Sequence, residues 1–270
     1  MRTATRPSPG GAGPVGLMVS VETEGGIIAG SLRPATKGSV SPCGFRRGTI
    51  AGVPVIYAVS GIGRTNAAHC LTSLILHYSP SAVILFGVGG GYPGVGLGVG
   101  DIAVATKEVY VDEGVLLDDG IHSLEMIGIP LLKAGRRKYF NDFPLDATLA
   151  GRICRAARSA GQRVEAGVFA TVSACTGTTR RAEELSSRFG AICENMEGAA
   201  AAHICTLYGI PLVEVRGISN IVEARDASKW NIAEASENCQ RTVIEFLKAS
   251  DADGRCARRR NTKKGTGNNG

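Results

Sequence analysis

The chain has 270 residues, of which 44% are hydrophobic and 20% are charged. This composition can fill a core, so it excludes wholesale disorder and suits one large α/β domain or two small ones. The formal net charge is +6, but the basic residues of segment 255–270 account for the whole excess. The rest of the chain is neutral, so no basic surface for nucleic acid is expected on the folded part.

The eight cysteines are scattered, and no two of them form a C-x-x-C pair. Zinc ribbons and redox motifs are therefore not indicated, and reduced cysteines buried as small hydrophobic residues favour a cytoplasmic protein. No apolar run reaches the roughly 18 residues that span a bilayer, so we expect no membrane partner. The first run, Val15–Val21, is followed at once by acidic residues, which argues against a signal peptide.

Three segments are expected along the chain. Residues 1–14 are rich in Pro, Gly, Ser, Thr and Arg and predict a flexible leader. Residues 15–250 contain no repeat and no long linker, so they predict a single domain. Residues 251–270 are polar and basic and predict a disordered tail.

Taken in chain order, six short apolar runs have the length and composition of buried strands. They are Val15–Val21, Val53–Val59, Ala82–Phe86, Asp101–Thr106, Gly167–Val172 and Pro211–Ile218. Five further stretches have helical spacing of apolar residues: Thr65–Tyr78, Asp146–Ala160, Thr179–Phe189, Glu197–Tyr208 and Asn231–Ala249. Strands that alternate with helices predict a three-layer α/β fold, in which ligands bind beyond the carboxyl ends of the strands.

Two helix ends can be placed from local chemistry. Thr178 or Thr179 is a suitable N-cap for the helix that follows it. Gly209 is a suitable left-handed residue at the end of the Ala-rich helix, with Pro211 directly after it.

Two of the predicted strands are followed by segments that suit a ligand. Glu22 and Glu24 follow the first strand and precede two glycines, although a solvated loop would look the same. The stretch Gly87–Gly96 contains G-x-G spacings, but Pro93 and another strand follow instead of a helix, so a dinucleotide fingerprint is disfavoured. Its glycines suit either a tight turn or a close approach of the backbone to a small ligand.

Two more polar positions follow strands later in the chain. Glu197 comes after a short predicted strand, Ala191–Cys193, at the start of an Ala-rich helix, and could act as a ligand or as an ordinary capping acid. Ser219 and Asn220 end the last apolar strand, where an Asn could instead shape a turn. The four histidines show no spacing typical of a metal site or a catalytic dyad, so we expect no metal and no cofactor.

Together these segments resemble the nucleoside phosphorylase and nucleosidase family, which includes the methylthioadenosine/S-adenosylhomocysteine nucleosidases. The resemblance is carried by GLMVSVETE, GVGGGYPGVGLGVGD, GVFATVSACTG, ENMEGAAAAH and VRGISNIVEARDASKW. The pairing of N-M-E-G-A with R-G-I-S-N is specific, and the chain is most similar to the branch that hydrolyses futalosine in menaquinone biosynthesis. The resemblance implies a central mixed sheet flanked by helices, a nucleoside substrate and a homo-oligomer.

The resemblance also implies roles for individual residues. The catalytic pair would be Glu24, which activates water as a general base, and Asn220, which faces the purine. The substrate-binding residues would be Gly89, Gly90, Asn195, Met196, Glu197 and Ser219. Among them Glu197 would bind the ribose, the two glycines would line the sugar and water pocket, and Ser219 would orient the Asn220 amide. No aromatic residue occupies the place near Cys175 where the family stacks one on the base.

Asn220 is a departure from the adenine-specific members of the family, which have Asp at this position. Hypoxanthine presents two acceptors, N7 and O6, and an amide can donate to them, whereas a carboxylate would repel O6. Asn220 thus favours a 6-oxopurine, and the implied reaction is hydrolysis of the N-glycosidic bond of futalosine to hypoxanthine and dehypoxanthine futalosine.

Three alternatives stay open from the sequence. Hydrolysis of methylthioadenosine, S-adenosylhomocysteine or another purine nucleoside would use the same acids. Phosphorolysis is disfavoured because two carboxylates, Glu22 and Glu24, stand where phosphorylases of the family hold phosphate with an Arg. A catalytically silent nucleoside-binding protein is disfavoured by the joint presence of Glu24, Glu197 and Asn220.

Overall fold

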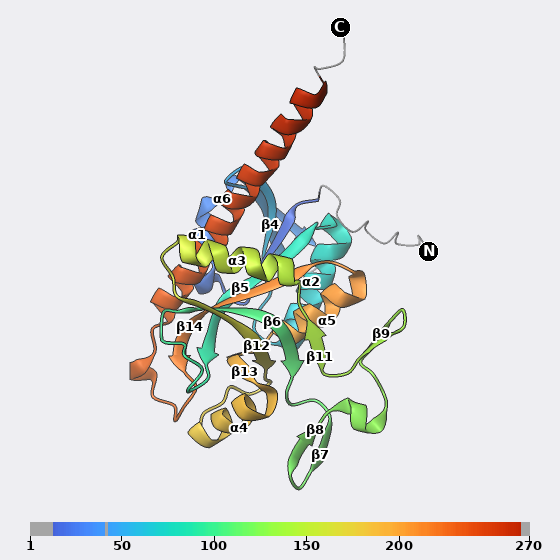
Figure 1. Cartoon of the computed structure of the whole chain (residues 1–270), viewed down its shortest axis with the longest axis vertical. Helices are drawn as coiled ribbons and strands as arrows, with labels where there is room; N and C mark the ends of the chain where they lie inside the picture. Colours follow the sequence, from blue (N-terminus) through green and yellow to red (C-terminus); the bar gives the residue numbers. More distant parts are fainter. Residues whose placement is uncertain (1–12, 41–42, 266–270) are drawn as a thin grey trace.

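The computed structural model describes residues 13–40 and 43–265, with the backbone alone described at residues 39, 40 and 251–265. A mixed sheet of ten strands crosses the centre of the molecule (Figure 1). Its strands are β1 (Val15–Val19), β2 (Arg33–Val40), β3 (Cys43–Ile50), β4 (Val53–Val59), β5 (Ala82–Gly91), β6 (Ile102–Tyr110), β11 (Asp142–Pro144), β12 (Val164–Thr171), β13 (Ala191–Asn195) and β14 (Leu212–Ile221).

Five of these strands close into a ring. β5 pairs in parallel with β14, which pairs antiparallel with β6; β6 pairs with β12, β12 with β13, and β13 returns antiparallel to β5. Four of the other strands extend the sheet from β5 in the order β1, β4, β3 and β2, and β11 pairs antiparallel with β6. The ring matters for function because it brings the ends of β5, β13 and β14 together.

Helices cover both faces of the sheet. One apolar core lies between the sheet and the helices α1 (Gly26–Ser31), α3 (Ala147–Ser159) and α6 (Ile232–Gly265). A second core lies between the opposite face and the helices α2 (Arg64–Tyr78) and α5 (Gly198–Tyr208). The fold is therefore the predicted three-layer α/β architecture with a central mixed sheet.

The predicted helix ends have a clear chemical basis. The Thr178 side chain accepts a hydrogen bond from Arg181 N and caps α4 (Thr179–Phe189). Gly209 ends α5 with φ of 69°, a left-handed conformation that suits glycine. Both predicted positions are confirmed.

Several predicted boundaries were wrong. β5 continues past Phe86 to Gly91, so the first glycines of the Gly-rich stretch belong to a strand and not to a loop. These glycines still pair through their backbones with β13 on one side and β14 on the other. The last helix runs past Ala249 to Gly265.

The sequence analysis also missed some elements. They are α1, the β2–β3 hairpin, and two small hairpins formed by β7 (Val115–Leu117) with β8 (Gly120–His122) and by β9 (Leu132–Ala134) with β10 (Arg137–Tyr139). The expected leader lies, apart from its last two residues, outside the described part of the chain. The disordered tail predicted at 251–270 stays a prediction. No helix among the described residues has the length and apolarity needed to cross a membrane.

Candidate active site

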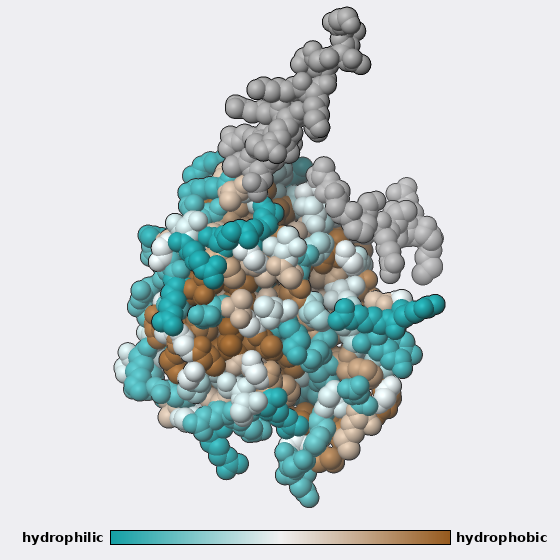
Figure 2. Space-filling model, in the orientation of Figure 1, coloured by the Kyte–Doolittle hydropathy of each residue, from teal (hydrophilic) through white to brown (hydrophobic). Residues whose placement is uncertain are grey.

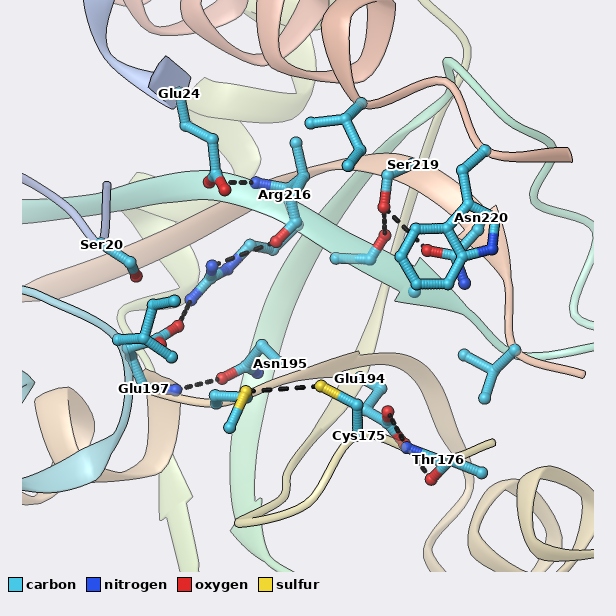
Figure 3. Close-up of a pocket in the computed structure, with 18 of the residues that line it drawn as sticks. Ser20, Glu24, Cys175, Thr176, Glu194, Asn195, Glu197, Arg216, Ser219 and Asn220 are labelled. Atoms are coloured by element: carbon cyan, nitrogen blue, oxygen red, sulfur yellow. Dashed lines mark hydrogen bonds and ion pairs between the residues drawn. The ribbon is translucent and has the colours of Figure 1, made fainter. Parts of the chain in front are cut away.

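A cavity of about 300 Å³ lies where β5, β13 and β14 meet. All eight residues that the sequence analysis singled out line it (Figure 3). They are Glu24, Gly89, Gly90, Asn195, Met196, Glu197, Ser219 and Asn220. Residues that were not predicted complete the wall: Ser20, Ile62, Val88, Cys175, Thr176, Glu194, Arg216, Val222, Arg225, Trp230 and Ile232.

Glu24 reaches the cavity from the short turn Glu22–Glu24 that follows β1. Its Oε2 accepts a hydrogen bond of 3.0 Å from Val88 N, which fixes one carboxylate oxygen (Figure 3). Burial raises the pKa of Glu24, while the Val88 N–H and the positive charge of Arg216 act in the opposite direction. Within the described part of the chain no group donates to Oε1, and a carboxylate with a raised pKa and one such oxygen has the properties of a general base.

Glu197 immediately precedes α5, and its carboxylate faces the cavity wall and not its own helix. Oε1 accepts a hydrogen bond of 2.8 Å from Gly63 N, and Oε2 accepts one of 3.2 Å from Arg216. The side chain makes no capping hydrogen bond to the helix. The alternative that Glu197 is an ordinary capping acid is therefore wrong.

Arg216 on β14 is the buried cation of the site, although the sequence analysis gave it no role. Only 2% of the residue is exposed. Its guanidinium pairs with Glu197 at 3.2 Å and with Glu214 at 2.8 Å, and it donates to Val88 O at 3.2 Å. A buried charge needs such partners, because its removal from water is otherwise too costly.

Behind Arg216 lies a second pair of acids, Glu108 on β6 and Glu214 on β14, both with 0% exposure. The burial of Glu108 and the nearby charge of Glu214 hold its pKa well above the usual carboxyl range. Glu214 has the Arg216 guanidinium as a partner at 2.8 Å, which acts against the rise of its own pKa on burial. Gly198 lies against both, since a Cβ there would come within 2.2 Å of Glu108 Oε1 and of Glu214 Oε2.

The Asn195 side chain lines the cavity but makes its hydrogen bonds to neighbouring protein groups. Its Nδ2 donates to Glu108 Oε1 at 2.7 Å, and its Oδ1 accepts from Glu197 N at 2.9 Å and Gly198 N at 2.7 Å. The amide is thus occupied by the protein. This geometry favours positioning of Glu197 over substrate binding for the Asn195 side chain.

Ser219 and Asn220 form the opposite side of the cavity at the end of β14. The Ser219 hydroxyl lies 2.8 Å from Asn220 Oδ1 and 3.2 Å from Gly89 O. Asn220 Nδ2 donates to Ile221 O at 3.2 Å and lies 3.6 Å from where a Cβ of Gly90 would stand. The amide is therefore oriented with its NH₂ group over Gly90, as expected if Ser219 orients it.

The glycines of β5 keep the floor of the cavity open. A Cβ on Gly89 would come within 2.7 Å of Cys193 Sγ, and one on Gly90 within 2.5 Å of Val222 Cγ2. Above this floor the apolar lining includes a sulfur pair, with Cys175 Sγ 3.4 Å from Met196 Sδ. Trp230 also lines the cavity, and the Arg225 guanidinium carbon lies 4.7 Å from the centroid of its ring.

Some of the residues that were missed carried a signal in the sequence. Arg216 is a lone cation inside the apolar strand Pro211–Ile218, and such a residue needs buried acids as partners. Glu194 and Trp230 lie inside motifs that carry the family resemblance. Glu108 carried no signal, because only the pairing of β6 with β14 and β12 places it beside the site.

No cluster of His, Cys, Asp and Glu suited to a metal ion occurs within the part of the chain that the structure describes. The cavity therefore combines three carboxylates (Glu24, Glu194 and Glu197), two arginines (Arg216 and Arg225) and two amides (Asn195 and Asn220) around a floor of glycines. Such an arrangement can hold a polar ring system between Asn220 and the sulfur pair and activate a water molecule beside Glu24.

Comparison with known proteins agrees with this architecture. The family model of the phosphorylase superfamily matches residues 14–248, and the chain belongs to this family. Futalosine hydrolase of Thermus thermophilus is 37% identical over 198 residues, which cover 73% of this chain and 83% of that protein. The 5'-methylthioadenosine/S-adenosylhomocysteine nucleosidase of Halalkalibacterium halodurans is 28% identical over 236 residues, covering 86% of this chain and 97% of that protein.

Solved structures show the same fold. The crystal structure of 5'-methylthioadenosine/S-adenosylhomocysteine nucleosidase from Neisseria meningitidis, in complex with methylthio-immucillin-A, superposes with a TM-score of 0.76 at 24% identity. It covers 87% of this chain and 99% of that one. The corresponding enzyme of Streptococcus pneumoniae gives a TM-score of 0.75 with the same coverage.

Proposed function

We propose that this protein hydrolyses the N-glycosidic bond of futalosine, releasing hypoxanthine and dehypoxanthine futalosine in menaquinone biosynthesis. The observation that carries the proposal is the amide of Asn220, whose NH₂ group lies over the glycine floor of a cavity that also holds Glu24 and Glu197. The similarity to futalosine hydrolase of Thermus thermophilus supports the same substrate.

Glu24 acts as the general base of the proposed reaction. Its Oε2 is held by Val88 N, which leaves Oε1 to take a proton from water as the water oxygen attacks C1′ of the sugar. The bond between C1′ and the base breaks through a transition state of oxocarbenium character, and its electron pair goes to the base.

Glu197 and Asn220 bind the two parts of the nucleoside. Each Glu197 oxygen already accepts one hydrogen bond and retains capacity for one ribose hydroxyl. The Asn220 amide donates to N7 or O6 and stabilises the charge that develops on the leaving hypoxanthine. Water supplies the hydroxyl group that bonds to C1′, and the proton that Glu24 takes from it ends on the leaving hypoxanthine, so no cofactor is consumed.

The choice of substrate rests on Asn220 and is tested through it. We expect kcat/KM to be higher for futalosine than for methylthioadenosine. The substitution Asn220→Asp should shift the ratio toward the adenine nucleoside by about tenfold or more, since one mismatched buried polar contact costs ~1–3 kcal/mol. Released hypoxanthine and adenine are measured for both proteins.

The two outcomes of this assay are separable. A wild-type preference for methylthioadenosine would contradict the proposed substrate and favour the nucleosidase activity named for the Halalkalibacterium halodurans relative. An unchanged ratio in the Asn220→Asp variant would remove only the role given to Asn220.

We further propose that the protein is a cytoplasmic homo-oligomer. Apolar side chains are exposed on β7 and on the turn Leu124–Ile127, among them Leu116 at 75% and Met126 at 58% exposure. Figure 2 shows apolar residues at several places on the otherwise hydrophilic surface. Exposed apolar groups of this kind are typical of surfaces that contact another chain. Light scattering on the full chain tests the assembly, and a monomer at micromolar concentration would contradict it. The seven described cysteines are free, as suits the cytoplasm.

A further inference from the structure

We propose that Gln240 and Ser236 of α6 are positioning residues for Glu24, although neither of them lines the cavity. The inference rests on the proposed function, in which Glu24 is the general base, and it adds the groups that hold this base in place. Figure 1 shows α6 beside α1, and α6 also contacts the turn that carries Glu24.

The turn Glu22–Glu24 is held by few hydrogen bonds of its own. Glu24 N donates to Val21 O at 3.2 Å, and Gly25 N donates to Glu22 O at 3.1 Å. Hydrogen bonds of this 3₁₀ type have poorer geometry than those of an α-helix. The place of the Glu24 side chain therefore depends on groups outside the turn.

Gln240 binds the backbone that follows the turn. Its Oε1 accepts from Ile27 N at 2.8 Å and from Ile28 N at 3.2 Å. These N–H groups belong to the first turn of α1, where a helix has no internal partner for them. Gln240 is 3% exposed, so bulk water cannot replace this contact. The start of α1, directly after Glu24, is thus fixed to α6.

Ser236 binds Glu24 directly. Its hydroxyl donates to Glu24 O at 3.2 Å and accepts from Gln240 Nε2 at 3.1 Å. Because the amide of Gln240 donates to the Ser236 oxygen, the hydroxyl hydrogen is left for the Glu24 carbonyl. The two side chains therefore form one hydrogen-bonded unit that holds the backbone at Glu24 and just beyond it.

The surroundings of Glu24 leave little room for another position. A Cβ on Gly25 would clash with the Tyr57 hydroxyl, and a Cβ on Gly87 would come within 2.6 Å of Glu24 Oε2. Val88 N holds the same carboxylate oxygen. Proton transfer requires Oε1 to lie within hydrogen-bond reach of the attacking water, and a displacement of about 1 Å can cost ~100-fold in rate. The contacts from α6 can therefore set the rate without touching the substrate.

A contribution to stability alone is the competing explanation, because both side chains are buried. The two roles differ in what they predict. Loss of a merely stabilising contact lowers the melting temperature and leaves the kcat of the folded enzyme unchanged. Loss of a positioning contact lowers kcat with little change in KM, and this loss disappears when residue 24 can no longer act as a base.

The test is a double-mutant cycle on the full chain with futalosine as substrate. Gln240→Met keeps the length of the side chain and removes its hydrogen bonds, so kcat should fall about tenfold while KM stays within about twofold. Ser236→Ala removes one bond to Glu24 and should lower kcat about threefold. In the Glu24→Gln background both substitutions should change kcat by less than about twofold, because residues that act as a unit are not additive.

Two further variants separate positioning from general damage. Gln240→Glu keeps an acceptor for Ile27 N and Ile28 N and should keep kcat within about threefold of wild type. Asn238→Ala is the matched control on the same helix, since its amide donates to Gly100 O and accepts from Gln162, away from Glu24. Its kcat should stay within about twofold of wild type. Thermal unfolding shows that each variant is folded.

An unchanged kcat in folded Gln240→Met, or the same loss with and without Glu24→Gln, would overturn the inference. If Gln240→Met does not fold, the cycle of Ser236→Ala with Glu24→Gln decides in the same way. A wild type that cleaves methylthioadenosine in preference to futalosine would overturn the proposed substrate instead. The cycle is then measured with methylthioadenosine, so the two failures are distinguishable.

Discussion

Four glutamates surround Arg216, and they form two pairs that solve the problem of buried negative charge differently. Glu24 and Glu197 face the cavity and accept hydrogen bonds from backbone N–H groups, at Val88 and Gly63 respectively. Glu108 and Glu214 lie behind the cavity with no exposed surface.

The difference lies in how each pair is neutralised. The cavity pair has backbone donors and lies beside the charge of Arg216 at the wall of the cavity. In the buried pair the Arg216 guanidinium contacts Glu214, and burial together with the neighbouring Glu214 carboxylate holds the pKa of Glu108 well above its usual range. Arg216 thus lies between a pair of acids at the proposed site of chemistry and a pair buried in the fold, and substitutions in the two pairs should separate activity from stability.

The largest effect is expected for Glu24→Gln. The amide keeps the shape of the side chain but cannot take a proton from water, so kcat should fall by ~100-fold or more, while the melting temperature changes little. Steady-state kinetics and thermal unfolding measure the two quantities. Glu22→Gln is the control, since this neighbouring acid is exposed and pairs with Arg46 outside the cavity. Near-normal turnover of folded Glu24→Gln would remove Glu24 from the mechanism.

The next effect is expected for Glu214→Leu, and it concerns stability. Removal of one partner from a buried ion pair leaves Arg216 undercompensated and should lower the free energy of unfolding by about 3–5 kcal/mol, measured by urea denaturation. Glu223→Ala breaks an exposed pair with Lys229 and should cost less than ~1 kcal/mol. A loss in Glu214→Leu no larger than that of the control would show that the buried pair contributes nothing to the fold.

The smallest effect is a shift in the pH dependence. Glu24 must be ionised to act as a base, and burial raises its pKa. Activity should therefore be full at high pH and fall as the pH drops through a value above the ordinary carboxyl pKa of about 4.5. The profile of kcat/KM against pH measures this limb. A profile that stays flat down to the ordinary carboxyl range would contradict the proposed environment of Glu24.

Much of the layered fold was predictable from the sequence because its strands are locally apolar and its helices have caps such as Thr178. The β2–β3 hairpin was not, since RPATKGSV and CGFRRGTI are polar and lack a simple alternation. The length of β5 was also missed, because a run of glycines is typical of a loop. Only the partners on β13 and β14 make it a strand.

The candidate site likewise has a part that the sequence predicted and a part that it did not. Glu24, Glu197 and Asn220 could be identified because each follows a strand and lies in a motif. The networks that hold them could not, since Glu108, Asn195 and Thr171 come from three strands that meet only in the folded sheet. A residue type predicts what a side chain is able to do, but its partners decide whether it faces the ligand or the protein.

The hydrogen bonds at the start of α5 affect whether an inorganic anion can bind at the site. A helix N-terminus commonly binds an anion, because its first N–H groups lack partners within the helix. Here the N–H groups of Glu197 and Gly198 donate to Asn195 Oδ1, and that of Ala199 donates to Thr171 Oγ1. These three N–H groups are thus already occupied by neutral side chains. An inorganic anion would therefore meet a helix start whose first three N–H groups are taken, beside the carboxylates of Glu24 and Glu197, and this disfavours its binding in place of the water that the proposed reaction uses.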